Sequence, residues 1–456
     1  MKTKQNQELD LTQGVIWRQM LRFFWPICLG MLFQTLYSTV DALIVGRLVG
    51  SGALAAVGNT SSVINVLVGF FNGLSAGATV LTAQYFGARN RSSLLRCVGT
   101  SLFLSGVLGL IMTVLALVLA PWIMTVIETP AEIYADSVLY LRLYALGMIP
   151  MSVYNLGSGV LRGLGDSKSP VRILAVSSVC NVVLDIVLVT VIPLGVAGVA
   201  IATTVSQVVS FALVWAIFAR GRCEGLCIRL RDCRPGRGMV GQVLRIGVPA
   251  AVQSTSYNFT NLLLQAAING FGTATVAAWT AYSKVDTVFW LTSAAMSSTI
   301  TTFVGQNYGA CNLPRVKKGV RTALGMSVGM TVGTCVLLIV FCEPLFRVFT
   351  PDPQVVEIGC EMLRFLAMFY GIYTVSDVFS GAVRATGDAF WPMILNLISV
   401  CLVRVLWVWL VLPRFHTIIM LCTSYPVSWA IGSVLFILYY RSGRWDKHRL
   451  RQCGLR

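Results

Sequence analysis

The feature that most constrains this chain is a motif that occurs twice. Residues 158–170 read SGVLRGLGDSKSP, and residues 380–392 repeat the pattern as SGAVRATGDAFWP, 222 positions later. Two further pairs keep the same separation: LTAQYFGARN at 81–90 with FVGQNYGACN at 303–312, and Leu141-Arg142 with Leu363-Arg364. Three motifs in register indicate an internal duplication. The fold is therefore expected to consist of two similar halves.

The composition places both halves in a membrane. Of the 456 residues, 56% are hydrophobic and only 12% are charged, and the mean hydropathy is +0.76. Soluble domains carry about 25% charged residues. The apolar runs are also long enough for membrane helices, which need about 20 residues each. We therefore predict an all-α integral membrane protein whose surroundings are the lipid bilayer.

Twelve apolar runs fit such helices, six on each side of a basic stretch. They lie at 23–46, 53–85, 94–120, 134–161, 172–193, 196–219, 240–269, 275–305, 317–342, 356–383, 392–412 and 416–440. Because six is even, both halves cross the membrane in the same direction, as parallel repeats related by a pseudo-two-fold axis along the membrane normal. We predict two six-helix bundles: an N-terminal lobe at 14–219, a basic linker at 220–239, a C-terminal lobe at 240–440 and a basic tail at 441–456.

The basic residues of the loops predict the orientation. Of the 35 lysine and arginine residues, 28 fall on the side of the membrane that holds both termini and the linker, whereas the opposite loops are acidic or neutral. Cytoplasmic loops carry such an excess. The termini are therefore expected in the cytoplasm, and no signal peptide is recognised before the first run. This pattern accounts for the net charge of +17, so no nucleic-acid partner is predicted.

Six charged residues fall inside the apolar runs, where charges are costly. The acids are Asp41, Asp185, Asp286 and Asp377, and the bases are Lys284 and Arg404. Each costs at least about 2.5–3.5 kcal/mol near the bilayer centre, so such residues usually face the bundle interior or water and mark an ion or substrate path. The alternative is a structural ion pair inside the bundle. The two halves differ in this respect.

In the first half, Asp41 and Asp185 have no basic residue in their own runs, and both are expected in the outer half of the membrane at comparable depth. Polar residues lie near them or in neighbouring runs: Tyr37, Asn155, Asn181 and Thr203. Two unpaired carboxylates in a low dielectric repel each other, so the pair is expected to hold a proton near neutral pH or to share a cation such as Na⁺ with amide and hydroxyl oxygens. We predict that this pair binds a coupling ion.

In the second half, opposite charges are available to the acids. Asp377 stands at the position equivalent to Asn155, Arg404 lies in the eleventh run, and Lys284 is two residues from Asp286. Charge pairing and direct transport chemistry are therefore both open for these four residues.

At this point the motifs resemble a known family. TLYSTVDALIVGRLVGSGALAAVG at 35–58 is similar to the first-helix signature of the MATE (multidrug and toxic compound extrusion) transporters, within the multidrug/oligosaccharidyl-lipid/polysaccharide flippase superfamily. LTAQYFGA and FVGQNYGA resemble the Gln-Gly motifs of these transporters, and VLRGLGDSKSP, NVVLD and GVAGVAIATTVSQ complete the pattern. The resemblance covers about 14–440.

The resemblance implies a secondary antiporter that works by alternating access around a cavity between two six-helix bundles. It assigns the ion site of the family's N-terminal lobe to the residues named above for the first half, and it adds Tyr140. The full set is Tyr37, Asp41, Tyr140, Asn155, Asn181, Asp185 and Thr203. One departure concerns the seventh helix, which is acidic in NorM-like members but holds no acid at 240–269 here. Coupling through the C-terminal lobe is therefore in doubt, and Asp41 and Asp185 become the stronger candidates.

We interpret the chain as an exporter of organic, cationic or amphipathic compounds in a prokaryotic inner membrane, driven by H⁺ or Na⁺ and with a monomer as the default state. One alternative is a flippase for lipid-linked oligosaccharides or polysaccharides from the same superfamily. Another is an integral-membrane enzyme acting on lipids, but the two histidines, His416 and His448, have no catalytic or metal-ligand cluster around them in the sequence. No nucleotide-binding glycine loop appears in the large loops, so ATP is not expected to be the energy source. Neither enzymatic activity nor a cofactor is predicted.

Overall fold

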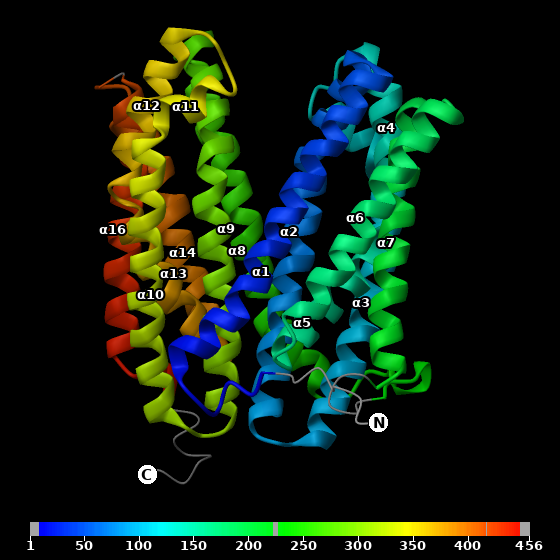
Figure 1. Ribbon diagram of the computed structural model, residues 1–456, viewed down its shortest axis with the longest axis vertical. Helices are drawn as coiled ribbons and strands as arrows, with labels where there is room; N and C mark the ends of the chain where they lie inside the picture. The colour runs from blue at the N-terminus through cyan, green and yellow to red at the C-terminus, as the bar shows by residue number, and fades with distance from the viewer. Residues whose placement is uncertain (1–8, 222–226, 416, 447–456) are drawn as a thin grey trace. The chain divides into compact units, whose positions relative to one another are not determined.

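The chain folds into long helices, most of which run parallel to the axis of the unit that contains them (Figure 1). The computed structural model describes residues 9–221, 227–415 and 417–446. Within these ranges no β-strand occurs. The prediction of an all-α membrane protein is confirmed.

The described residues of the first half form seven α-helices and two π-helical turns. They are α1 (Ile16–Ile44), η1 (Val45–Val49), α2 (Ser51–Gly87), α3 (Arg91–Val126), α4 (Ala131–Leu146), α5 (Met148–Gly163), α6 (Lys168–Ile186), η2 (Val187–Val191) and α7 (Gly195–Ala219). A short 3₁₀ turn, η3 (Leu230–Asp232), lies in the linker that follows.

In the second half, the part of the chain that the structure describes forms nine α-helices, another π-helical turn and a final 3₁₀ turn. They are α8 (Met239–Asn269), α9 (Thr273–Gly309), α10 (Leu313–Val340), α11 (Cys342–Arg347), α12 (Pro353–Ala367), α13 (Tyr370–Ala385), α14 (Phe390–Asn396), η4 (Leu397–Leu402), α15 (Val403–Leu410), α16 (Ile418–Arg441) and η5 (Arg444–Asp446).

All twelve predicted spans are found, some of them divided. The fourth span bends by 51° between α4 and α5, and the eleventh is formed by α14, η4 and α15. Eight helices of the described residues, or nine with α4 and α5 taken together, are long and apolar enough to cross a membrane by length and composition alone. The others, α8, α9 and α12 with α13, carry more polar residues, among them Asp286 and Asp377.

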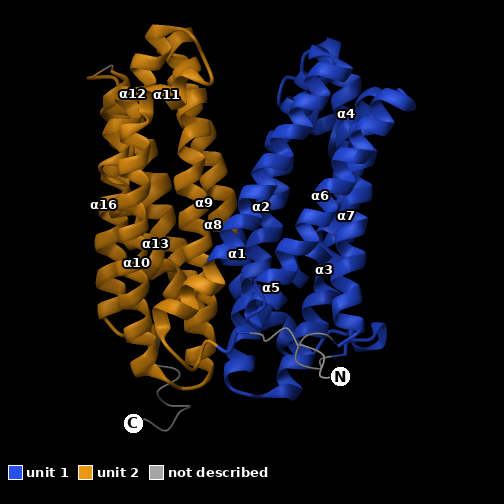
Figure 2. Cartoon of the chain, in the orientation of Figure 1, with its two compact units in different colours: residues 1–10, 25–251 blue, residues 11–24, 252–456 orange. Residues whose placement is uncertain are grey.

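The helices gather into two compact units (Figure 2). Unit 1 comprises residues 1–10 and 25–251, and unit 2 comprises residues 11–24 and 252–456. The sequence places the division in the linker at 220–239, whereas the contacts place it inside α8, after Ala251. The reason is close packing in unit 1: a Cβ added to Gly73 of α2 would lie 2.2 Å from the Ala251 Cα atom.

An N-terminal turn explains why residues 11–24 belong to unit 2. Leu11 is fully buried, and its backbone N–H donates to Gln306 Oε1 at 3.0 Å. Asn307 donates its amide to the Leu11 carbonyl at 3.1 Å, and the Arg315 guanidinium donates to the Gly14 carbonyl at 2.9 Å. Gln306 and Asn307 belong to the duplicated FVGQNYGACN motif, so this motif positions the start of the chain.

The duplicated motifs perform the same structural task in each half. Asn90 caps α3 by accepting a hydrogen bond from the Ser93 N–H, and Asn312 caps α10 by accepting one from the Arg315 N–H. Asp166 accepts hydrogen bonds from the backbone N–H groups of Lys168 and Ser169 at the start of α6. In the second half, Asp388 accepts from the N–H of Trp391 in α14. The repeated residues thus cap equivalent helix starts in the two halves.

Candidate functional site

Two carboxyl groups approach each other inside unit 1. Asp41 lies in the last turn of α1, Asp185 lies in the last turn of α6, and their side chains are within hydrogen-bonding reach of each other. Asp185 is fully buried. Neither forms an ion pair with any basic residue that the structure describes. The helices therefore place two acids together without a compensating cation.

An amide on α6 fixes the position of one carboxylate. Asn181 lies one turn before Asp185 and is also fully buried. With its amide oriented to satisfy both ends, Asn181 Nδ2 donates to Asp185 Oδ2 at 2.8 Å, and its carbonyl oxygen accepts from the Thr203 N–H on α7 at 3.2 Å. Asp41 Oδ1 and Asp185 Oδ1 are buried and find no donor among the described side chains and backbone groups. Two oxygens of the pair thus remain to hold an ion.

Tyrosines from two helices border the pair. The Tyr37 hydroxyl lies within hydrogen-bonding distance of Thr203, and Tyr37 and Tyr140 are both close enough to interact electrostatically with Asp41. Tyr140 is 4% exposed, and its ring stacks with that of Tyr144 one turn later on α4, with centroids 6.3 Å apart. Tyr144 is not among the site residues predicted from the sequence, although its spacing of four residues from Tyr140 places it on the same helix face.

Asn155 is the predicted N-lobe residue that the structure does not join to this group. It lies on α5, where its amide donates to the Met151 carbonyl of the same helix at 2.9 Å, and its own carbonyl accepts from the Ser75 hydroxyl at 2.7 Å. The structure thus brings together Tyr37, Asp41, Tyr140, Asn181, Asp185 and Thr203, and gives Asn155 a packing contact instead.

Both aspartates are followed by π-helical turns. Asp41 comes four residues before η1, and Asp185 comes two residues before η2. A π-helical turn shifts the backbone register and leaves local carbonyl groups poorly paired, and such turns occur often at functional sites. No local sequence pattern predicts these turns, because they depend on how α1 and α6 pack against their neighbours.

This arrangement has a limited set of chemical uses. Two carboxylates in contact cannot both remain charged in a buried setting unless a proton or a cation lies between them. The described residues hold no group of three or more His, Cys, Asp or Glu side chains suited to a metal ion. A single proton, or a weakly held Na⁺ ligated partly by hydroxyl and amide oxygens, suits the pair.

The second half holds a separate buried acid, Asp286 of α9. The Tyr370 hydroxyl on α13 donates a hydrogen bond to one carboxylate oxygen of Asp286. The Trp290 indole N–H donates to the other at 2.5 Å. The Tyr370 hydroxyl also bonds with that of Tyr282 at 2.9 Å, and its ring stacks on Phe289 with centroids 4.0 Å apart. Asp286 is therefore satisfied by neutral aromatic donors within a closed core.

Asp377 on α13 takes different partners from those expected. The hydroxyls of Ser293 and Ser297 on α9 donate to its two oxygens at 2.9 and 3.1 Å. The cation that interacts with it electrostatically is Arg384, two turns later on the same helix. Arg384 directly follows the apolar run predicted at 356–383, so hydropathy places it in a cytoplasmic loop and does not indicate this interaction.

Arg404 and Lys284 form no ion pair with Asp286 or Asp377 in the described residues. Arg404 is 2% exposed; its Nε donates to the Ser428 hydroxyl at 3.1 Å, and its guanidinium lies 4.0 Å from the Tyr425 ring centroid. Lys284 is exposed on α9. Charge pairing and direct transport chemistry are the two alternatives for these four residues. The described side chains form no ion pair among them.

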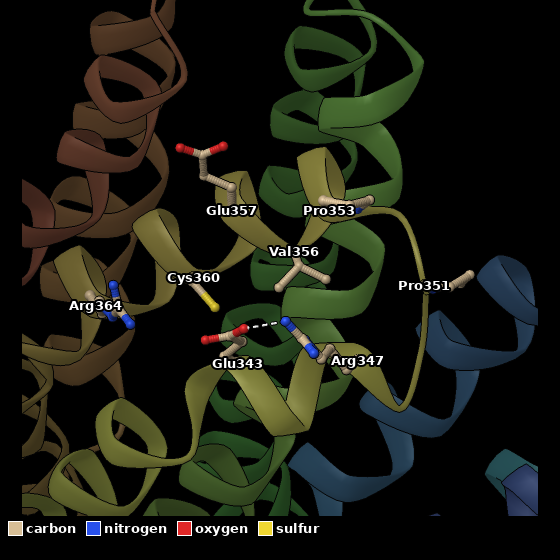
Figure 3. Close-up of a pocket in the computed structure, with 8 residues that line it drawn as sticks. All are labelled: Glu343, Arg347, Pro351, Pro353, Val356, Glu357, Cys360 and Arg364. Carbon is tan, nitrogen blue, oxygen red and sulfur yellow. Dashed lines mark hydrogen bonds and ion pairs between the residues drawn. The ribbon is translucent and has the colours of Figure 1, made fainter.

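A further pocket lies where α11 meets α12 (Figure 3). Its volume is about 670 Å³, and Glu343 and Arg347 form an ion pair at 2.5 Å beside it. Both side chains are more than half exposed, so this pair contributes little to stability. None of the membrane acids lines this pocket.

A protein-family model matches both halves of the chain. The MatE model matches residues 26–187 and again residues 249–410, once in each half of the duplication. The Bacillus subtilis protein named "Probable multidrug resistance protein YpnP" is 27% identical over 446 residues, which cover 97% of this chain and 98% of that protein. The Staphylococcus aureus (strain MRSA252) protein named "Multidrug export protein MepA" is 22% identical, with 84% of this chain and 85% of that protein covered.

Solved structures share the fold. A structure described as the "Outward-facing conformation of a multidrug resistance MATE family transporter of the MOP superfamily" matches 96% of this chain and 98% of its own, with a TM-score of 0.88 and 23% identity. A "MOP superfamily transporter from Pyrococcus furiosus" matches with the same TM-score and coverage at 24% identity. The twelve-helix architecture in two bundles is thus confirmed. The chain belongs to the MATE family of multidrug transporters.

Proposed function

We propose that this transporter is a secondary antiporter that exports organic, cationic or amphipathic compounds in exchange for H⁺ or Na⁺ by alternating access. The observation that carries the proposal is the approach of Asp41 and Asp185 without a basic partner in the described residues. An ion that neutralises such a pair stabilises one conformation over another when its affinity differs between them. Substrate release is then coupled to ion binding.

Each surrounding residue has a part in this mechanism. Asn181 holds Asp185 in place through its amide, and Thr203 holds Asn181 through its backbone N–H. Tyr37 and Tyr140 place hydroxyl groups near Asp41, where they supply polar oxygens to an entering ion. Because the carboxylate oxygens left without donors are buried, an ion bound there is shielded from water and interacts strongly with both acids.

The location follows from the same reasoning. We place the transporter in a prokaryotic inner membrane with the basic side, including both termini, in the cytoplasm. Names of the Bacillus and Staphylococcus relatives, which refer to multidrug resistance and export, support an outward direction of transport for a range of compounds.

The test uses proteoliposomes that contain the purified transporter and a fluorescent organic cation. A pH gradient and a Na⁺ gradient are imposed separately, with protein-free liposomes as the control. The proposal predicts uphill movement of the cation under one gradient and none without a gradient. Absence of movement under both gradients would contradict antiport and direct attention to lipid-linked saccharides as substrates, the flippase alternative.

A further inference from the structure

A groove in unit 2 combines an apolar interior with a cationic mouth. It has a volume of about 490 Å³, within the range of pockets for small organic ligands. Lys317 and Arg321 stand one turn apart near the start of α10, and Arg441 is the last residue of α16. All three are exposed, and none has an acidic partner within 4 Å among the side chains that the structure describes, which in this segment end at Trp445.

The interior of the groove is formed by apolar side chains of three helices. Val320 and Leu324 come from α10, Val375 and Phe379 from α13, and Ile437 from α16. Since α10 begins and α16 ends at the cations, the charges mark the end of the membrane-spanning segments, and the apolar walls continue toward their centre. A ligand that fits both parts is anionic at one end and apolar at the other.

The duplication shows that the groove is a departure from the first half. The positions 222 residues earlier than Lys317, Arg321 and Arg441 are Leu95, Gly99 and Ala219. There the linker covers the equivalent surface. Ile228 is fully buried in a cluster with Val98, Leu102, Val153 and Phe218, and a Cβ on Gly99 would lie 2.2 Å from the Asp232 carbonyl oxygen.

In the second half, Trp445 after α16 covers only part of the equivalent surface: it is 6% exposed, and its ring stacks on that of Tyr440 with centroids 5.1 Å apart. Three cations replace neutral residues at the mouth, and the hollow remains. The tail at 447–456 carries four lysines and arginines and no acid, so by sequence it would add charge of the same sign. Charge complementarity therefore favours an anionic occupant from outside the chain.

We propose that this groove binds an anionic membrane phospholipid, with its phosphate between Lys317, Arg321 and Arg441 and an acyl chain along Val375, Phe379 and Ile437. Basic pockets between membrane helices recognise such headgroups. A headgroup without an acyl chain would contact only the cations and would leave the apolar walls uncovered. The bound lipid occupies the hollow that remains in unit 2 beside Trp445.

The test measures lipid retention by native mass spectrometry on the full-length transporter in detergent. Phosphatidylglycerol and phosphatidylcholine are added in parallel to the wild type, to the groove variant Lys317→Ala/Arg321→Ala/Arg441→Ala, and to a control with equal charge loss, Arg96→Ala/Arg172→Ala/Lys318→Ala. The proposal predicts preferential retention of phosphatidylglycerol, lowered at least about tenfold in the groove variant but not in the control. Added salt should weaken it by screening.

Three results would overturn the proposal. Equal retention by the groove variant and its control would mean that binding is not at these cations, and equal retention of both lipids would remove the headgroup argument. Displacement of phosphatidylglycerol by inorganic phosphate alone would indicate a site for a free anion. A charge-preserving variant, Lys317→Arg/Arg321→Lys/Arg441→Lys, should bind as the wild type does and so guards against a loss caused by misfolding.

Discussion

The side chain of Asp185 lies within hydrogen-bonding reach of Asp41, while one of its oxygens accepts a hydrogen bond from Asn181 at 2.8 Å. Helices α1 and α6, far apart in the chain, thus bring two acids together, and the amide one turn away holds one of them in place. The arrangement is stable only if something neutralises part of its charge. This relationship is the physical basis of the proposed coupling.

Replacement of Asn181 tests the support of the pair. Asn181→Ala removes the donor to a fully buried carboxylate, which should lower the free energy of unfolding by about 1–3 kcal/mol. Thermal unfolding of the purified transporter measures the change. Asn155→Ala is the matched control, because its amide donates only to a carbonyl of its own helix; a loss in the control as large as in Asn181→Ala would contradict the assignment.

A second prediction concerns the buried acid of unit 2. Tyr370→Phe keeps the ring that stacks on Phe289 but removes the hydrogen bond to Asp286, at an expected cost of about 1.5–3 kcal/mol for a charged acceptor. In the double variant with Asp286→Asn the cost should be smaller than the sum of the single changes, since the two residues interact directly. Additive losses in unfolding experiments would show that the hydrogen bond contributes nothing specific.

Arg404 allows a test of a buried cation that has no acidic partner in the described residues. Arg404→Lys should destabilise the transporter by about 1–2 kcal/mol, because an ammonium cannot reproduce both the contact with Tyr425 and the bond to Ser428. Arg404→Met should change stability by less than about 1 kcal/mol, since an apolar residue avoids the desolvation of the charge. The reverse order of the two variants would indicate an ionic role that the structure does not show.

The linker provides a prediction on pH. Burial, and then the adjacent Asp232 carboxylate, raise the pKa of the Cys233 thiol, whereas Cys227 is exposed. A raised pKa means less thiolate at neutral pH, and the thiolate is the reactive form. In single-cysteine variants, maleimide should therefore label Cys227 faster than Cys233 at pH 7, and the rate for Cys233 should continue to increase at higher pH. Equal rates with the same pH profile would contradict the environment described for Cys233.

Much of this architecture could be predicted from the sequence, for identifiable reasons. A polar residue in an apolar helix is costly, so Asp41, Asp185 and Asn181 could be recognised without a structure. Motifs repeated at one separation predicted two equivalent halves, and the capping roles of Asn90 and Asn312 explain why those residues repeat.

Other features depend on three-dimensional packing. The bend between α4 and α5 and the π-helical turns after Asp41 and Asp185 have no local sequence signal. Asp377 interacts with Arg384 rather than with Arg404, because residues seven apart on one helix lie on the same face after two turns. Likewise, hydropathy could not show that Asn155 bonds within its own helix instead of joining the acids.

The most direct test of the central claim is to locate ion coupling among the four membrane acids. Efflux of a fluorescent organic cation from proteoliposomes is measured under the gradient that drives the wild type, for Asp41→Asn, Asp185→Asn, Asp286→Asn and Asp377→Asn, each at matched protein content. The account predicts that gradient-driven efflux is lost in Asp41→Asn and Asp185→Asn and retained in folded Asp286→Asn and Asp377→Asn. Full gradient-driven efflux in Asp41→Asn together with its loss in Asp377→Asn would contradict the account and place the coupling site in unit 2.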